Sequence, residues 1–342
     1  NVLVTAQSNV GIAVGPDGRL EGSRLDVSRS GDPQRGGGIV FLSNGSEVHA
    51  SLINENLGAG IVIGPPDGSR PVSGNVIDGT TISSNLAGVV LSPGSTRNSI
   101  TRNDIMWNRL GGVTITPYDD KPAPRENRFS ANRYDENGLR PIVLNLESEP
   151  NSLARAGDCD RDRRTANNAQ NNLPNNGIPA PLIASAQISN EDTAPLVTIR
   201  GRACPGQVVE LYQSFVTSSV REKVGVEMPR IRGVKNEVET ITNSEREMTL
   251  PSIGEFNYIG SANTASDGTF EATFPFLIVK EGVDKATLDV DRDTDIWARD
   301  VLRSAKPEER AFSAVAIDTA GNTSEMSVRR KVERRVATRE QR

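Results

Sequence analysis

Residues 103–115 read Asn-Asp-Ile-Met-Trp-Asn-Arg-Leu-Gly-Gly-Val-Thr-Ile, and they end in a short phrase of glycine, aliphatic, any residue, aliphatic. The phrase recurs through the first half of the chain as Gly11–Val14, Gly38–Phe41, Gly60–Ile63, Gly88–Leu91 and Gly112–Ile115. A sixth copy, Ile142–Leu144, follows Arg140-Pro141 instead of glycine. The five glycines are 27, 22, 28 and 24 residues apart. A repeat of this period indicates a solenoid.

Asparagine marks the same phase of each repeat. Five asparagines lie two to four residues before the strand phrase: Asn9, Asn56, Asn85, Asn108 and Asn137. Further short aliphatic segments lie upstream, so each repeat holds three strands separated by polar turns. Asparagine and glycine suit such turns because they tolerate left-handed backbone angles. We predict a coil in which each strand pairs with its equivalent in the next coil, about 4.8 Å away, with turn asparagines stacked on one another.

The stretch 103–115 resembles the repeat of right-handed parallel β-helix proteins, which include the NosD-like and carbohydrate-active β-helix families. The resemblance implies a β-helix over residues 1–146. Because a coil that began at Asn1 would expose unpaired strand edges, which natural solenoids cap, we expect further coils, a cap or a partner chain before it.

The second half of the chain has a different pattern. Residues 147–180 are rich in Asn, Asp, Pro and Arg and are predicted to be a linker. Residues 181–330 contain seven predicted strands with turn signals between them: Leu182–Ile188, Val197–Arg202, Val208–Ser214, Phe256–Ala262, Thr269–Phe274, Phe312–Ile317 and Ser324–Arg329. This pattern is typical of an immunoglobulin-like (Ig-like) β-sandwich, and residues 314–325 resemble the last hairpin of bacterial Ig-like modules. The whole chain is therefore predicted to be all-β.

Two segments interrupt the predicted sandwich. Residues 216–254 and 279–310 exceed ordinary hairpin loops, so each is either a functional excursion or disordered. Residues 331–342 form a charged, Arg-rich tail, expected to be a solvated end or a short helix, with docking as the alternative.

Composition and charge exclude several classes of function. The formal net charge is -5 and aromatic residues make up 4% of the chain, which argues against nucleic acid as a partner. No apolar run approaches the length of a transmembrane helix. The two cysteines, Cys159 and Cys204, fit one disulfide in an oxidising compartment, with two free thiols as the alternative. We expect an extracellular, cell-surface or periplasmic location.

Candidates for catalysis are few. The one histidine, His49, has no nucleophile elbow near it, so Ser-His-acid catalysis and zinc binding are disfavoured, and a structural role is expected. Enzymes of the fold that the repeat resembles mostly act on acidic polysaccharides, but the motifs of alginate epimerases and polygalacturonases are absent here. The best local candidate is a polar loop in which adjacent carboxylates could act as acid and base: Tyr118, Asp119, Asp120 and Arg125. A non-catalytic excursion loop is the alternative.

Two acidic runs could bind calcium, and no other cofactor is expected. The first presents alternating carboxylates at Asp289, Asp291, Asp293 and Asp295, with Thr294 where an EF-hand loop requires glycine. The second comprises Asp158, Asp160 and Asp162. Solvated acidic turns balanced by neighbouring arginines are the alternative for both.

Two functions fit these observations. The first is a non-catalytic scaffold or adhesin of a bacterial surface, with the β-helix as a rigid rod that binds polysaccharide or a partner protein. The second is a polysaccharide lyase, epimerase or hydrolase acting on an acidic glycan. A cluster of carboxylates and basic residues on one face of adjacent coils would favour the second.

Overall fold

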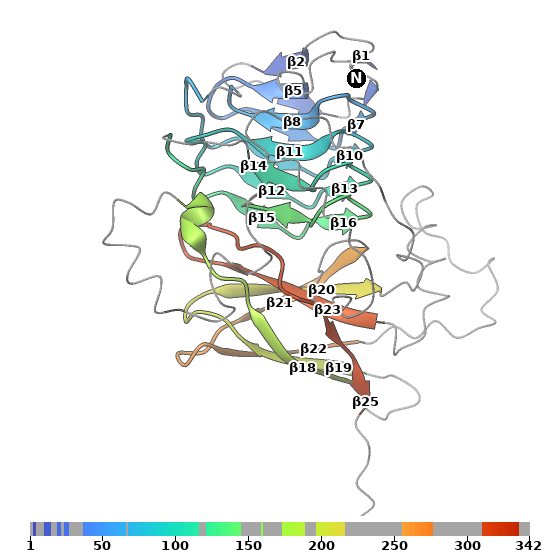
Figure 1. The fold of residues 1–342 in the computed structure, drawn as a ribbon, viewed down its shortest axis with the longest axis vertical. Helices are drawn as coiled ribbons and strands as arrows, with labels where there is room; N and C mark the ends of the chain where they lie inside the picture. Colours follow the sequence, from blue (N-terminus) through green and yellow to red (C-terminus); the bar gives the residue numbers. More distant parts are fainter. Residues whose placement is uncertain are drawn as a thin grey trace, which may run out of the picture.

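The computed structural model describes residues 3–4, 10–14, 19–21, 24–26, 37–65, 68–115, 121–144, 159, 173–188, 196–215, 255–275 and 310–334. Within these ranges the chain is almost entirely β, and its one helix is the short 3-10 helix η1 (Pro174–Gly177). Stacked coils form the N-terminal half, and the C-terminal strands lie across the end of the stack (Figure 1).

Three parallel sheets make up the coils. We call these sheets A, B and C. Each coil contributes one strand to sheet B, then one to sheet C and then one to sheet A. Sheet B contains β2 (Val10–Val14), β5 (Gly37–Phe41), β8 (Ala59–Ile63), β11 (Ala87–Leu91), β14 (Val113–Ile115) and β17 (Ile142–Val143). Sheet C contains β3 (Arg19–Glu21), β6 (Glu47–His49), β9 (Val76–Asp78), β12 (Ser99–Thr101) and β15 (Arg128–Ser130). The parallel part of sheet A contains β1 (Leu3–Val4), β4 (Arg24–Asp26), β7 (Leu52–Asn54), β10 (Thr81–Ser83), β13 (Asp104–Met106) and β16 (Arg133–Asp135). Three strands per repeat, each paired with its equivalent, confirm the prediction.

Each three-residue strand of sheets A and C gives the core of the stack its central residue, whereas the strands of sheet B give it two, as Ile61 and Ile63 do in β8. Because side chains alternate between the two faces of a strand, a three-residue strand buries its central residue and turns its ends outward. In sheet C the inward ladder is Val48, Ile77, Ile100 and Phe129, all fully buried. Each such side chain contributes about 1.5–3 kcal/mol by leaving water.

Asparagine ladders run along the corners of the coil, but their role differs from the predicted one. The left-handed backbone angle belongs to the residue before the asparagine, as in Ser84 (φ 56°) and Trp107 (φ 54°). The prediction that these asparagines themselves supply that angle is therefore wrong. Instead, the side-chain Oδ1 of Asn85 accepts hydrogen bonds from the backbone N–H (3.0 Å) and Nδ2 (2.7 Å) of Asn56 in the preceding coil. The same pattern continues from Asn85 to Asn108.

The repeated glycine is required by close packing. A Cβ atom on Gly60 would lie 2.6 Å from Ile82 Cγ2 and 2.8 Å from Asn85 Nδ2. The strand of sheet B can therefore approach the corner asparagine only where it carries no side chain.

The C-terminal strands form two further layers. Sheet A continues beyond β16 with antiparallel strands β21 (Phe256–Asn263), β20 (Val208–Phe215), β23 (Arg310–Ile317) and β24 (Arg330–Lys331). Sheet D consists of β22 (Thr269–Pro275), β19 (Leu196–Arg202), β18 (Leu182–Ile188) and β25 (Glu333–Arg334). A second core lies between the two layers and includes Ile183, Ile199, Leu211, Phe270 and Phe312. We call these strands, together with the described segments that precede and connect them, the C-terminal module.

Six of the seven predicted strands of this module are present, each within two residues of its predicted ends. The seventh, Ser324–Arg329, is wrong, because the segment is not a strand. The hydroxyl groups of Ser324 and Ser327 accept the backbone N–H of Ala316 (2.9 Å) and Ala314 (2.8 Å), where carbonyl groups would accept in a regular ladder. Strands β24 and β25 carry ordered structure to Arg334, within the segment interpreted as a tail.

The C-terminal module supplies the hydrogen-bond acceptors that the next coil would provide. In the stack, corner N–H groups donate to the following coil, as Gly74 does to the carbonyl of Thr96 (3.3 Å). At the last coil, Glu126 N–H donates to Asn322 Oδ1 (2.6 Å) and Ala131 N–H to Glu210 Oε2 (2.8 Å). Other last-coil contacts of this kind are Asn127 to Asn175, Phe129 to Thr323 and Leu144 to Glu325.

The core is also continuous across this junction. Tyr212, Phe256, Val315 and Met326 of the module belong to the same buried cluster as the inward ladders of the coil. The backbone ladder crosses the junction at one pair, Tyr134 with Phe256. The coil and the module therefore share this buried cluster. Of the predicted linker 147–180, only residue 159 and residues 173–180 lie within the described part of the chain.

Candidate functional site

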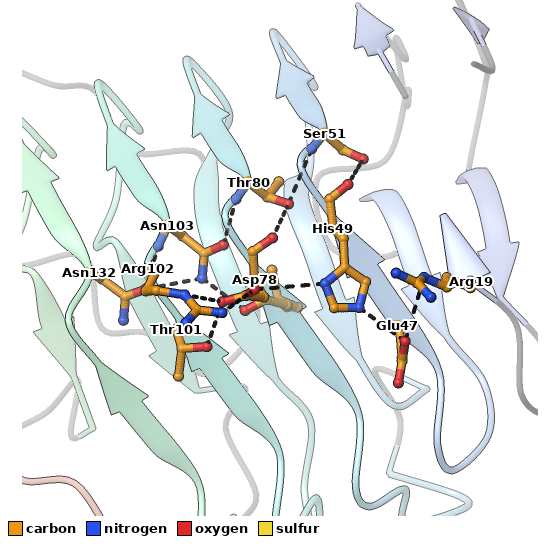
Figure 2. Close-up of polar contacts among 11 residues, drawn as sticks. Arg19, Glu47, His49, Ser51, Asp78, Thr80, Thr101, Arg102, Asn103 and Asn132 are labelled. Atoms are coloured by element: carbon orange, nitrogen blue, oxygen red, sulfur yellow. Dashed lines mark hydrogen bonds and ion pairs between the residues drawn. The ribbon is translucent and has the colours of Figure 1, made fainter. Parts of the chain in front are cut away.

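The outward face of sheet C carries a row of polar and charged side chains from neighbouring coils. His49 ends β6, Asp78 ends β9 and Thr101 ends β12, and the three occupy equivalent positions in the parallel register. Their side chains point away from the core, because the central residue of each strand is the inward one. The ladder places these groups on adjacent strands of one flat face (Figure 2).

Asp78 is the centre of this cluster. Its Oδ1 accepts hydrogen bonds from Arg102 Nε (3.0 Å) and Thr101 Oγ1 (2.9 Å), and its Oδ2 accepts one from Arg102 Nη2 (2.6 Å). The two-pronged hydrogen bond from Arg102 is the largest cause that lowers the pKa of the Asp78 carboxyl, with Thr101 adding to it against the opposing effect of burial. Asp78 is therefore held as a carboxylate.

His49 lies between two carboxylates (Figure 2). Its Nε2 is 3.0 Å from Glu47 Oε2, and its Nδ1 is 3.8 Å from Asp78 Oδ2. Arg19 Nε lies 3.7 Å from the same oxygen of Glu47. Glu47 is the hydrogen-bonded partner of the imidazole, whereas Asp78 lies beyond hydrogen-bond distance on the other side of the ring.

Arginine side chains are the outermost groups on this face. Arg102 is 72% exposed against 18% for its partner Asp78. Arg19 is 56% exposed against 41% for Glu47. Arg97, at the corner before β12, is 75% exposed against 28% for Glu126. In each pair the carboxylate sits nearer the sheet and the guanidinium faces solvent, so the face presents mainly N–H donors to a ligand.

The loop predicted as an acid/base site is only partly placed. Tyr118, Asp119 and Asp120 lie outside the described residues. Arg125 is half-buried between β14 and β15, where it forms an isolated bridge with Thr96. The proposed catalytic grouping therefore remains a prediction.

The acidic runs considered for calcium also fall outside the described part of the chain. These are Asp158, Asp160 and Asp162, and Asp289, Asp291, Asp293 and Asp295. Within the described ranges no group of three or more His, Cys, Asp and Glu side chains is arranged to hold a metal ion. Cys159 and Cys204 are joined by a disulfide, with their Cα atoms 5.3 Å apart.

The sequence singled out His49 as an isolated histidine and did not predict that Glu47 and Asp78 lie beside it. Asp78 lies 29 residues further along the chain, one coil later, and the intervening coil carries a longer turn than the next one. The signal that could have found Asp78 is its position within the repeat. His49 lies two residues before the corner residue Ser51, and Asp78 lies two residues before the equivalent corner residue Thr80. Counting from the corners would have aligned Glu47, His49 and Asp78 on one face.

The stacked coils with in-register parallel sheets define a parallel β-helix. Residues 1–149 match the family model described as the right-handed beta helix region, and the match ends shortly after β17. A search of curated proteins finds no match to the chain. Among the described residues, no helix has the length and apolar character needed to cross a membrane.

Proposed function

We propose that the chain is a secreted or cell-surface scaffold protein that binds an extended polysaccharide along the outward face of sheet C and does not cleave it. The observation that carries this proposal is that Arg19, Arg97 and Arg102 each project beyond their carboxylate partners on sheet C or at its corners. Arg102 uses Nε and Nη2 on Asp78, and the remaining N–H groups of this 72% exposed side chain suit hydroxyl and carboxylate oxygens.

The spacing of the coils supports an extended ligand. Equivalent positions recur about every 4.8 Å along the stack. On sheet C they hold His49, Asp78 and Thr101, so a polymer lying along the axis would meet a polar side chain at each of these coils. Thr101 and His49 add hydrogen-bonding groups between Asp78 and Glu47. A partner protein with an acidic edge is the other ligand that these donors would suit.

The C-terminal module fits an attachment or spacer role. Its two layers suggest an Ig-like module, and its disulfide to Cys159 suits an oxidising compartment outside the cytoplasm. The module and the coil share a buried cluster, which suits a surface rod of a bacterial cell.

A second function is favoured by one observation, the position of His49 between Glu47 and Asp78 beside Arg102 and Arg19. Removal of the proton next to a uronate carboxylate needs a base and a nearby cation. His49 could act as the base, and an arginine could neutralise the carboxylate of an acidic glycan. This would make the chain a polysaccharide lyase or epimerase, or a related hydrolase.

One experiment separates the two functions. The full chain is incubated with a panel of acidic and neutral polysaccharides, and binding and new reducing or unsaturated ends are followed in the same samples. Binding without new ends supports the scaffold. Turnover supports the enzyme, in which case His49→Gln should abolish it. Absence of both binding and turnover across the panel would contradict a glycan ligand.

A further inference from the structure

Two buried carboxylates share one guanidinium at the junction between the coil and the C-terminal module. Arg133 Nη2 lies 3.0 Å from Glu255 Oε1 and 3.6 Å from Asp135 Oδ2. The side chains of Asp135 and Glu255 are only 2% and 5% exposed. Among the described residues, Asp135 Oδ2, Glu255 Oε2 and Arg133 Nε have no hydrogen-bond partner.

These groups surround the single backbone pair that joins the two parts of the chain. Arg133 and Asp135 flank Tyr134 on β16, and Glu255 precedes Phe256 on β21. Tyr134 and Phe256 are the paired residues, and both are fully buried. Any change of charge here therefore acts directly on the junction.

The local charge does not balance if every group is ionised. Asp135 faces Glu255 just before β21, Asp104 from β13 and Glu136 from the corner after β16, and among the described residues Arg133 is the one cation that acts on it. A second buried negative charge beside one guanidinium is costly in a low-dielectric interior. Burial first, and then Glu255, raises the pKa of Asp135 to about 7, and burial also raises the pKa of Asp104.

A metal ion is a poorer way to balance this charge than a proton. Arg133 already occupies the space between the carboxylates. No set of three acidic or histidine ligands is arranged for a metal within the described residues.

We propose that a proton held on Asp135 keeps the coil and the C-terminal module together, and that the junction loosens as the proton is lost on going from mildly acidic to mildly alkaline conditions. The inference goes beyond glycan binding and does not depend on it. The direction of this pH dependence follows from the difference in the pKa of Asp135 between the folded and the unfolded chain. The folded chain keeps this proton up to about pH 7, whereas an unfolded Asp releases it near pH 4. This contribution to stability is therefore complete below about pH 4 and is lost as the pH rises through about 7.

The test compares the full-length wild type with Asp135→Asn and with a matched control, Glu271→Gln, whose carboxylate pairs with Arg200 on the exposed face of sheet D. Urea unfolding is measured at pH 5, 6, 7 and 8. The wild-type folding constant, taken relative to Asp135→Asn, should fall by at least about tenfold between pH 5 and pH 8. The Glu271→Gln variant should show no such trend over this range.

A direct measurement keeps the proposal testable if Asp135→Asn folds poorly. The carboxyl ¹³C signal of Asp135 in the wild-type chain should titrate near pH 7, and amide exchange at Tyr134 and Phe256 should speed up over the same range. Titration of Asp135 near pH 4 would overturn the proposal. So would a stabilisation of the wild type by calcium at pH 8 that is absent in Asp135→Asn, because a cation would then hold the site.

Discussion

The asparagine ladders offer the sharpest test of how the coil is held together. Asn85 is fully buried in the middle of the ladder formed by Asn56, Asn85, Asn108 and Asn137. Replacing it by alanine removes four hydrogen bonds: two accepted from Asn56 and two donated, to Ile53 O (3.2 Å) and Asn108 Oδ1 (3.1 Å). It also leaves the backbone N–H of Asn56 without the acceptor it has in the ladder.

The magnitude follows from these losses. A buried hydrogen bond contributes about 1 kcal/mol net, and a stranded buried donor costs about 1–3 kcal/mol. We therefore expect Asn85→Ala to lower the free energy of unfolding by about 3–5 kcal/mol, a large part of the roughly 5–15 kcal/mol of a typical domain.

The assay is urea unfolding followed by circular dichroism, with Asn44→Ala as the matched control. Asn44 also accepts a backbone hydrogen bond from the next coil, from Ser73 N (2.8 Å), but it is exposed, so water replaces the lost partner. We expect this control to cost less than about 1 kcal/mol. Equal losses for Asn85→Ala and Asn44→Ala would refute the role given to the buried ladders.

Three further predictions concern packing, pH and the disulfide. Gly60→Ala should destabilise the chain by about 1–3 kcal/mol in urea unfolding, because its Cβ would overlap Ile82 and Asn85. Arg102→Gln should raise the lowered pKa of Asp78 towards its ordinary value, as seen by carboxyl ¹³C titration. The ion pair with Arg102 should therefore stabilise the folded wild type above the lowered pKa of Asp78, and this stabilisation should disappear as the pH falls through that pKa. The Arg102→Gln variant should show no such pH-dependent loss of stability. Reduction of Cys159–Cys204, which spans 45 residues, should lower stability by about 4 kcal/mol on the loop-entropy model, measured by unfolding with and without dithiothreitol.

The coil was predictable from sequence because its signal is periodic. The phrase around Gly60 and Gly88 repeats with residue type, position and spacing in agreement, and the strands β8 and β11 lie where the phrase does. The sequence did not show why a glycine is needed at position 60. It is needed because Asn85 of the neighbouring coil packs where a side chain would lie.

The junction was not predictable, because it depends on contacts between distant parts of the chain. Asn322 accepts a hydrogen bond from Glu126, 196 positions earlier, and Glu210 accepts one from Ala131, 79 positions earlier. No local pattern marks either acceptor. Residues 173–180 were interpreted as part of a linker for the same reason, although Asn175 extends the corner ladder by accepting from Asn127.

The candidate site falls between these two cases. His49 was noticed as the one histidine, and its neighbours Glu47 and Asp78 follow from the register of β6 and β9 once the coil is known. The exposure of Arg102 above Asp78 is a property of side-chain packing that the sequence pattern does not contain.

The central claim is that the arginine-rich face of sheet C binds an extended polysaccharide. The most direct test is the affinity of wild type, Arg102→Ala and Arg200→Ala for the polymer that binds best in the panel. Arg200 is a matched control because it is an exposed arginine paired with a carboxylate, Glu271, on sheet D. We expect Arg102→Ala to weaken binding by about tenfold or more and Arg200→Ala to leave it unchanged. Unchanged binding by Arg102→Ala, or equal losses in both variants, would contradict the assignment of the site.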